Sequence, residues 1–424
     1  MKKNEKVKDE TNCDLLIIGS GMAGFSAAIF AGELGLKTVI AGKSGETLYS
    51  SGLIDLLGSF SPDEKKVSSN PWDLMKKLRK SGLKHPYTLM EDQNIEKSLE
   101  NITQHLGEAG LKYKSGKENT SIITPLGHPK TTYYYPQTMD NNQLAYKNKP
   151  SCMIVGFERL RGFSPQMMKE VLGKEWKNLG SGLIKLPFFD HMSSIYTENI
   201  ARFLEVEKNR DLFADLLKPY VKGFEYVGLP PVLGIRNPSE IQKELEEKIS
   251  VKLFEIPAMP PSITGTRLKE AFHKILSQMG VIFLNNYTVV EDSETGGKLT
   301  FIASRDNLED KIVPKNVLLA SGRFIGKGLL AKRSGITETV FGIPVNQPKD
   351  RTKWHSRNFF DPNPVNLAGI EIDESFRPLD AKGKPLFNNL FAAGSILSNN
   401  DWKRMKCGSG VAIASAYAAI QNMK

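Results

Sequence analysis

Residues 13–42, CDLLIIGSGMAGFSAAIFAGELGLKTVIAG, decide the fold of this chain. Residues 15–18 form a continuous apolar run, which is typical of a buried parallel strand. Small apolar residues then recur at helical spacing as far as Gly35, and residues 37–41, apolar from Val39 on, are expected to form a second strand. The stretch therefore predicts strand, tight turn, helix and parallel strand, the βαβ unit of nucleotide-binding sheets.

The turn between the first strand and the helix fits the pattern G-x-G-x-x-G. It consists of Gly19, Ser20, Gly21, Met22, Ala23 and Gly24. Gly19 permits the tight turn, Gly21 lets the backbone approach a phosphate, and Gly24 allows close packing of the helix. The helix N-terminus offers free N–H groups and a partial positive charge to that phosphate. We therefore expect all six residues to bind a nucleotide cofactor.

The second strand lacks the acidic residue with which such strands usually end. In dinucleotide-binding folds this Asp or Glu holds the adenosine ribose, but here Gly42 and Lys43 stand at the strand end. Lys43 and Ser44 suit a phosphate instead, the first as a cation and the second as a hydroxyl donor. FMN ends in such a phosphate, so the sequence predicts FMN, with Lys43 and Ser44 among its ligands. The alternative is FAD, with its ribose bound by backbone groups or water.

A second glycine-rich region, near the C-terminus, favours a flavin over a nicotinamide. LFAAGS at 390–395 is followed by GSGV at 408–411, and the pair resembles the second flavin motif of flavoproteins with two dinucleotide-binding domains. In that pattern an acidic residue usually binds the ribityl chain, and Ser395 takes its place here. The last helix would direct its N-terminus at the pyrimidine side of the flavin, where reduction places negative charge. The predicted ligands in this region are Gly394, Ser395, Gly408, Ser409, Gly410 and Val411.

Composition restricts the class of protein. The chain has 424 residues, 40% hydrophobic and 25% charged, which is typical of a globular protein with about two domains. No apolar run reaches the roughly 18 residues of a spanning helix, and the charged N-terminus is not a signal peptide, so we expect a cytoplasmic protein. Its three cysteines form no CxxC pair, and neither an iron–sulfur cluster nor another metal site is expected.

The formal charge of +10 has several explanations. It can serve solubility, an anionic substrate, an acidic partner subunit or an anionic membrane surface. Nucleic acid is the weakest of these, because Lys and Arg are dispersed and no basic stripe alternates with aromatic residues. The sequence therefore predicts no nucleic-acid partner.

The pattern of elements predicts a discontinuous α/β domain of the Rossmann-like FAD/NAD(P)-binding type. Residues 1–12 are expected to be a disordered tail, and 13–120 together with 259–424 the flavin-binding domain. Residues 121–258 are expected to form an inserted α+β capping or substrate domain. Helical patterns near 72–79 and 94–109 fall inside the first part of the flavin-binding domain.

Several segments together resemble the B subunit of anaerobic glycerol-3-phosphate dehydrogenase. The resemblance covers most of the chain, and its more specific segments are SSGLIDLL at 50–57, HPYTLM at 85–90 and PPSITGTRL at 260–268. It implies an FMN-linked subunit paired with a catalytic FAD subunit that oxidises glycerol 3-phosphate to dihydroxyacetone phosphate. An iron–sulfur membrane-anchor subunit would then pass the electrons towards quinone. The chain itself would be peripheral at the inner face of the cell membrane, held there only through a partner.

The resemblance also suggests where further cofactor ligands lie. Fumarate-reductase-like flavoproteins place small and hydroxyl residues along the flavin at the position of Ser50, Ser51 and Gly52. These three residues are therefore expected to bind the cofactor. An ordinary helix cap would explain the same residues.

Residues for substrate chemistry are predicted from their chemical type. Alcohol oxidation by a flavin needs a base for the hydroxyl proton, and His85 is the main candidate, with His128 as another. Capture of a phosphate needs Arg or Lys, and Arg267 and Arg323 follow turns near the expected cofactor domain, as does Arg404 in the loop before the last helix. We predict His85, Arg267 and Arg323 as catalytic residues, although each of these types is also common in purely structural positions.

Three functions are compatible with these patterns. The first is the FMN electron-transfer subunit described above. The second is a free-standing FAD-dependent oxidoreductase related to fumarate reductase, in which the inserted domain closes over the substrate. The third is a scaffold subunit that has kept the fold and lost the flavin, but an empty site would not need the close backbone approach at Gly19, Gly21 and Gly24.

Overall fold

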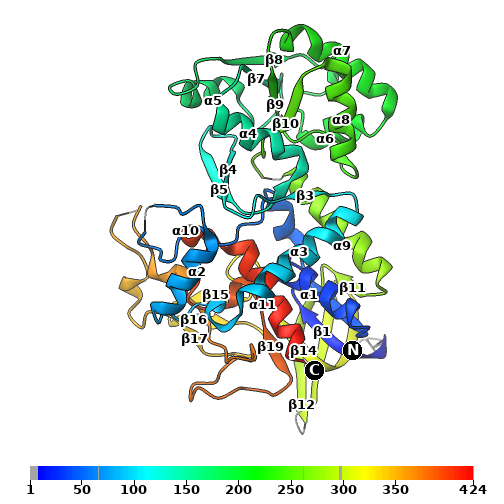
Figure 1. Ribbon diagram of the computed structural model, residues 1–424. Helices are drawn as coiled ribbons and strands as arrows, with labels where there is room; N and C mark the ends of the chain where they lie inside the picture. Colours follow the sequence, from blue (N-terminus) through cyan, green and yellow to red (C-terminus); the bar gives the residue numbers. More distant parts are fainter. Residues whose placement is uncertain (1–7, 65, 261, 296–297, 359, 424) are drawn as a thin grey trace. The chain divides into compact units, whose positions relative to one another are not determined.

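The computed structural model (Figure 1) describes residues 8–64, 66–260, 262–295, 298–358 and 360–423. The chain forms two compact units. The first unit consists of Met1–Glu46, Asp55–Ile102 and His273–Lys424. The second unit consists of Thr47–Ile54 and Thr103–Phe272. The predicted insertion, 121–258, is narrower than this second unit.

A seven-stranded sheet forms the core of the first unit, in the order β11-β2-β1-β14-β13-β12, with β19 also paired to β14. The strands are β1 (Lys8–Ile18), β2 (Thr38–Gly42), β11 (Ile282–Asn285), β12 (Thr288–Thr295), β13 (Lys298–Arg305), β14 (Leu308–Leu319) and β19 (Leu390–Ala392). β11, β2, β1, β14 and β19 run parallel, whereas β12 and β13 are antiparallel additions. Ligands of such sheets bind at the carboxyl ends of the parallel strands.

The residues that begin the sheet confirm the predicted βαβ unit. Residues 15–17 of β1 are fully buried, as a strand with neighbours on both sides and helices on its faces requires. α1 (Met22–Glu33) follows β1 and lies beside α11 (Gly408–Gln421), the last helix of the chain (Figure 1). The rings of Phe30 and Tyr417 meet edge to face between them, with centroids 5.1 Å apart.

The first unit carries further elements outside the sheet. The predicted helices at 72–79 and 94–109 are confirmed as α2 (Pro71–Lys80) and α3 (Asp92–Glu108), the latter ending in the second unit. α9 (Ile263–Gln278) likewise belongs to both units. The short helix η1 (Ser44–Tyr49) also belongs to both units. The remaining elements of the first unit are β15 (Leu329–Lys332), β16 (Gly335–Glu338), β17 (Val345–Asn346), β18 (Gly369–Ile370), α10 (Trp402–Met405) and the short helices η2 (Pro86–Leu89), η5 (Arg351–Lys353), η6 (Pro364–Leu367) and η7 (Gly394–Ile396).

The second unit has its own parallel sheet, in the order β10-β9-β7-β8. Its strands are β7 (Cys152–Phe157), β8 (Leu179–Ile184), β9 (Tyr226–Leu229) and β10 (Lys252–Glu255). Its helices are α4 (Asp140–Asn148), α5 (Pro165–Leu172), α6 (Thr197–Leu204), α7 (Glu207–Val221), α8 (Pro238–Ile249) and the short η3 (Gln137–Met139) and η4 (Pro187–Phe189). Two antiparallel pairs complete the unit: β3 (Tyr113–Lys114) with β6 (Tyr135–Pro136), and β4 (Thr120–Ile123) with β5 (Pro129–Thr132).

Two expectations from the sequence need correction. The insertion was expected to be α+β, but its main sheet is parallel and its strands alternate with helices, so the unit is α/β in character. The predicted tail at 1–12 is also too long. Residues 1–7 lie outside the described part, but β1 begins at Lys8 and Thr11 already pairs with Ile312 of β14. The charged composition of 8–12 gave no strand signal, because this part of β1 is stabilised by pairing with β14, which is distant in the sequence.

Possible membrane-spanning helices and metal-binding clusters were sought among the described residues. Within these, no helix has both the length and the apolar character needed to span a bilayer. Nor do three or more His, Cys, Asp or Glu residues of the described part gather into a cluster that could hold a metal ion.

Candidate flavin site

The glycine loop lies where the carboxyl ends of β1 and β14 meet. Gly19 has φ +116°, and a Cβ there would lie 2.3 Å from the carbonyl oxygen of Ala320, directly after β14. A Cβ at Gly24 would lie 1.9 Å from the carbonyl oxygen of Gly19. Neither position can hold a larger residue unless the backbone moves. These two glycines therefore serve the predicted roles of tight turn and close helix packing.

Gly21 has a different environment, because no described residue other than its chain neighbours lies within 4 Å of the position its Cβ would take. It is the N-cap of α1, with φ −89°, which any residue can adopt. No side chain caps this helix end, and its first turn contains no acidic residue. An open space in front of an uncapped helix N-terminus can receive an anion, since free N–H groups and the positive end of the helix dipole face it.

Two buried hydroxyls flank this loop. Ser20 is 2% exposed, and its Oγ has no hydrogen-bond partner among the residues that the structure describes. The same holds for the Oγ of Ser321, two residues beyond β14. An unpaired buried hydroxyl costs free energy, so both groups can bind an oxygen of a phosphate or sugar at this edge. Ser20 was predicted, whereas Ser321 was missed because nothing in its local sequence, ASGRF, distinguishes it from a turn.

The end of β2 explains the missing acid. A Cβ at Gly42 would lie 2.8 Å from the backbone nitrogen of Ser20. The Gly19 N–H also donates to the carbonyl oxygen of Ala41 at 2.7 Å, which ties the loop to this strand. A carboxylate at position 42 therefore has no room. Lys43 is exposed, and the side chain of Ser44 lies outside the described part.

The C-terminal glycine region packs against α1. Gly394 has φ +85°, and its Cβ would lie 2.7 Å from that of Ala23. Its N–H donates to the Oγ of Ser415 in α11 at 2.9 Å. Ser395 follows in η7, partly exposed, with its carbonyl oxygen engaged by Arg323. The region is therefore positioned by contacts to both helices of the predicted flavin site.

The N-terminus of α11 is like that of α1, because no side chain caps it and its first turn, which begins at Gly408 and Ser409, has no acidic residue. Packing, however, explains why residue 410 is a glycine. Its Cβ would lie 2.3 Å from the hydroxyl of Tyr87, and its N–H donates to the carbonyl oxygen of Asp55 at 2.8 Å. Val411 is 1% exposed. These contacts favour packing over ligand binding for Gly410 and Val411.

Ser50, Ser51 and Gly52 belong to the second unit. Ser50 Oγ accepts the Gly52 N–H at 3.1 Å, and Thr264 donates to the carbonyl oxygen of Ser50 at 3.0 Å. The carbonyl oxygen of Gly52 accepts the Tyr113 hydroxyl at 2.8 Å. Their predicted contact with the cofactor stays a prediction.

Arg323 is buried and holds loops together. Among the described residues, its guanidinium donates to four backbone carbonyl oxygens, those of Ser395, Leu397, Asn400 and Asn366. Burial lowers the pKa of Arg323 to about 10, opposed by the negative charge of Asp401. Because its donors are engaged, the geometry favours a positioning role over the predicted catalytic one.

His85 is also enclosed. Its Nδ1 accepts the Tyr87 N–H at 3.1 Å and so caps η2, and its Nε2 lies 3.9 Å from the Sγ of Cys407. Burial lowers the pKa of His85 to about 3. A general base needs a free lone pair near the substrate, and the lone pair of Nδ1 is used. These contacts favour a structural role over the predicted one as base.

His85 has a consequence for acid stability. The unfolded chain binds a proton at this residue below its ordinary pKa of about 6.5, whereas the folded chain does so only near pH 3. The free energy of unfolding therefore decreases as the pH is lowered from about 6.5 to about 3. In His85→Asn, whose amide oxygen can still cap η2, the loss between pH 6.5 and 4.5 should be smaller by about 2 kcal/mol. Urea unfolding at both pH values tests this, with His128→Asn, at an exposed position, as the control for the loss of a histidine.

Arg267 lies in the core of the second unit, 1% exposed. It forms a two-pronged ion pair with Glu255, at 2.6 and 2.8 Å, and donates to the carbonyl oxygen of Gly234. Glu255 is itself fully buried and also accepts from Thr138 and from the Leu233 N–H. With every donor group directed into this network, the geometry favours a structural role for Arg267.

The two other residues considered for substrate chemistry are His128 and Arg404, which lies half-buried in α10. His128 is exposed in the turn between β4 and β5. Arg404 donates to the carbonyl oxygens of Pro62 and Phe360, and so connects loops of the first unit. Neither placement indicates a catalytic role.

A parallel sheet with a glycine loop at its edge, two uncapped helix N-termini and unpaired buried hydroxyls defines an α/β nucleotide-binding protein of the flavoprotein type. Its residues fit a flavin phosphate at Gly21, although not an acid-bound adenosine ribose at Gly42. Comparisons with known proteins agree. The family model "FAD binding domain" matches residues 14–411.

The B subunit of anaerobic glycerol-3-phosphate dehydrogenase from Pasteurella multocida is 30% identical over 434 residues, with 97% of this chain and 99% of the relative covered. The corresponding protein of Vibrio cholerae is 29% identical over 430 residues, with 97% and 96% covered. The 3-ketosteroid delta1-dehydrogenase of Sterolibacterium denitrificans, a solved structure, matches with a TM-score of 0.44 and 12% identity over 97% of this chain and 99% of that one.

The chain therefore belongs to the FAD binding domain family and, within it, to the family of the B subunit of anaerobic glycerol-3-phosphate dehydrogenase. This confirms the predicted resemblance and the predicted flavoprotein fold, and it places the chain in a family of flavin-dependent oxidoreductases.

Proposed function

We propose that this chain is the electron-transfer flavin subunit of an anaerobic glycerol-3-phosphate dehydrogenase assembly, with FMN as its flavin. The observation that carries the proposal is the cradle at Gly21, where the uncapped N-terminus of α1 faces open space. Ser20 and Ser321 supply unpaired hydroxyls beside it. Membership of the B-subunit family supports the reaction, since the relatives carry the name of that dehydrogenase.

The choice of FMN rests on the end of β2. The family match names FAD, but the ribose-binding acid of the usual FAD pattern has no room at position 42, where a Cβ would lie 2.8 Å from Ser20 N. FMN has no adenosine ribose to hold. Lys43, exposed at the strand end, would attract the terminal phosphate.

A bound flavin accepts electrons and passes them on one or two at a time. The chain's own residues would bind and orient it. The N-terminus of α1 holds the phosphate, and that of α11, with no acidic residue in its first turn, favours negative charge nearby. Because His85 and Arg323 have their polar atoms engaged, a relay agrees better with the geometry than direct oxidation of substrate does.

The proposed partners are a catalytic FAD subunit that oxidises glycerol 3-phosphate and an iron–sulfur membrane-anchor subunit that receives the electrons. The proposed location is peripheral, at the inner face of the cell membrane, through the anchor subunit. The described part contains no helix that could cross the membrane, which is compatible with this division of labour.

The flavin itself is the first test. Freshly purified protein should be denatured and the released flavin identified by mass spectrometry. We expect FMN at a ratio approaching one per chain. FAD would contradict the FMN assignment and favour a free-standing oxidoreductase, whereas a colourless protein that takes up no added flavin would favour a scaffold.

A second experiment tests the relay. Glycerol 3-phosphate should not reduce the flavin of the isolated chain in an anaerobic spectrophotometric assay, but it should do so once the catalytic subunit is added. Rapid reduction of the isolated chain would show a complete substrate site and contradict the relay.

A further inference from the structure

A cavity of about 740 Å³ lies in the first unit, and its wall includes none of the residues predicted to bind the flavin. Its wall includes the β15–β16 turn, the segment from Pro344 to Arg351 and the turn near Asp380. Three cationic side chains line it: Arg333, Lys349 and Arg351. All three residues are exposed to solvent, so a soluble anion can reach their charged groups.

The cations of this cavity have no anionic partner among the described residues. None of the three side chains forms an ion pair with any residue in the described ranges. Two acidic residues, Glu371 and Asp380, share the wall, but both are engaged: Glu371 pairs with Lys84 at 3.6 Å, and Asp380 accepts the N–H groups of its own turn.

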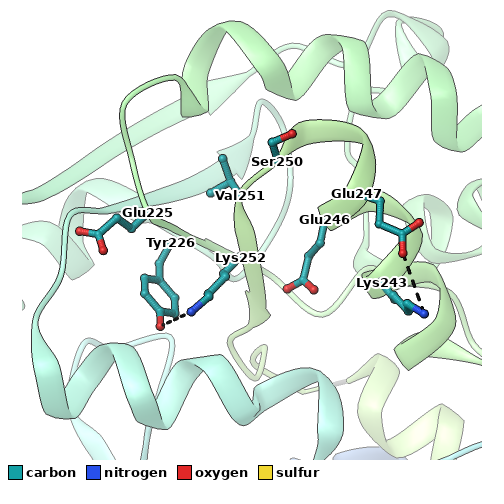
Figure 2. A pocket seen from close by; sticks show the side chains of 8 residues that line it. All are labelled: Glu225, Tyr226, Lys243, Glu246, Glu247, Ser250, Val251 and Lys252. Atoms are coloured by element: carbon teal, nitrogen blue, oxygen red, sulfur yellow. Dashed lines mark hydrogen bonds and ion pairs between the residues drawn. The ribbon is translucent and has the colours of Figure 1, made fainter.

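A second cavity, of about 540 Å³ in the second unit, differs from the first in how its cationic side chains are paired (Figure 2). Its lysines have partners within the wall. Lys252 donates to the Tyr226 hydroxyl at 3.3 Å, and Lys243 pairs with Glu247 at 3.9 Å, as the dashed lines in Figure 2 show. Within the described ranges, the protein thus gives the cations of one cavity a partner and leaves those of the other unpaired.

The wall of the first cavity is held in place by polar and ring contacts. Gln347 accepts the Ile336 N–H at 2.7 Å and donates to the Ile336 carbonyl oxygen at 2.8 Å, so β16 is fixed to this wall. The guanidinium of Arg351 lies over the ring of Trp354, 5.2 Å from its centroid. Trp354 is buried and donates to the carbonyl oxygen of Pro348 at 3.1 Å. A stacked guanidinium loses less freedom when it binds an anion.

We propose that this cavity binds the phosphate group of a phosphate ester, with Arg333, Lys349 and Arg351 as its ligands. Guanidinium and ammonium donors in this number match a phosphate better than a single carboxylate, because three oxygens accept at once. The site is separate from the flavin phosphate at Gly21, and the inference does not depend on the choice between FMN and FAD.

The ester has two possible sources, a soluble metabolite or a lipid headgroup. Two exposed apolar side chains close to the cavity in sequence, Ile325 at 80% and Leu330 at 48% exposure, could lie against acyl chains in the second case. The experiment must therefore include both sources as separate arms.

The test uses the full chain, loaded with flavin, and the triple variant Arg333→Ala/Lys349→Ala/Arg351→Ala. One arm titrates inorganic phosphate and glycerol 3-phosphate by calorimetry. The other measures flotation with phosphatidylcholine vesicles, with and without phosphatidylglycerol. The control variant Lys174→Ala/Lys177→Ala/Lys222→Ala removes the same charge from exposed positions of the second unit.

We expect binding in at least one arm, weakened at least ten-fold in the triple variant and less than two-fold in the control. Binding of soluble phosphate would identify a metabolite, and binding only of vesicles that contain phosphatidylglycerol would identify a headgroup. No binding in either arm, or equal loss in both variants, would overturn the proposal. Flavin content should be unchanged in every variant, which separates this site from the proposed electron-transfer function.

Discussion

Gly21→Val should empty the flavin site while leaving the protein folded. The backbone at Gly21 has φ −89°, which valine adopts readily, and among the described residues only its chain neighbours can lie within 4 Å of its Cβ position. The new side chain would instead occupy the space in front of the α1 N-terminus where the phosphate is proposed to bind. We expect flavin content to fall at least ten-fold, with the melting temperature equal to that of flavin-stripped wild type.

Absorbance of released flavin per chain, together with circular dichroism, measures both effects. Gly107→Val is the matched control, since its Cβ position is also open and it lies in α3, outside the flavin site. Normal flavin content in Gly21→Val would contradict the proposal that the flavin phosphate binds at the α1 N-terminus. Gly19→Val is not an equivalent test, because its Cβ would meet the Ala320 carbonyl oxygen and the variant would be expected to misfold.

Arg267→Leu should destabilise the protein by about 3–5 kcal/mol, because it leaves the carboxylate of Glu255 buried without its cation. Both side chains are almost fully inaccessible to solvent, at 1% and 0%. The double variant Glu255→Leu/Arg267→Leu removes both charges, so it should be markedly more stable than the single variant. Urea unfolding of the single and double variants measures the coupling.

Arg202→Leu provides the comparison for the same substitution at the surface. Arg202 pairs with Glu198 at 2.7 Å, but both side chains are at least half exposed, so the loss should stay below about 1 kcal/mol. A small loss in Arg267→Leu would show that Glu255 is uncharged or solvated. Flavin reduction through the proposed catalytic subunit should survive in the double variant, whereas it would be abolished if Arg267 were catalytic.

The sequence by itself determined the elements whose signals are local. The apolar run at 15–18, the glycines that follow it and the helical repeat to Gly35 predicted β1, the loop and α1 correctly, because each signal depends on neighbouring residues only. The same is true of α2, α3 and the last helix. The resemblance to the B subunit of the dehydrogenase could also be stated from short segments, and the family match confirmed it.

Tertiary structure decided what surrounds the individual polar residues and glycines. His85, Arg267 and Arg323 have the right chemistry for catalysis, but the groups that engage them lie at Cys407, Glu255 and the 395–400 loop. The sequence showed that Gly42 stands where an acidic residue is usual. The reason is the close approach of Ser20, and it becomes visible only when the strand and the loop are placed side by side. Burial and hydrogen-bond partners arise from residues distant in the chain, so no local pattern contains them. The sequence thus determined the class of cofactor domain, and only the packing determined which of its polar side chains are free to act.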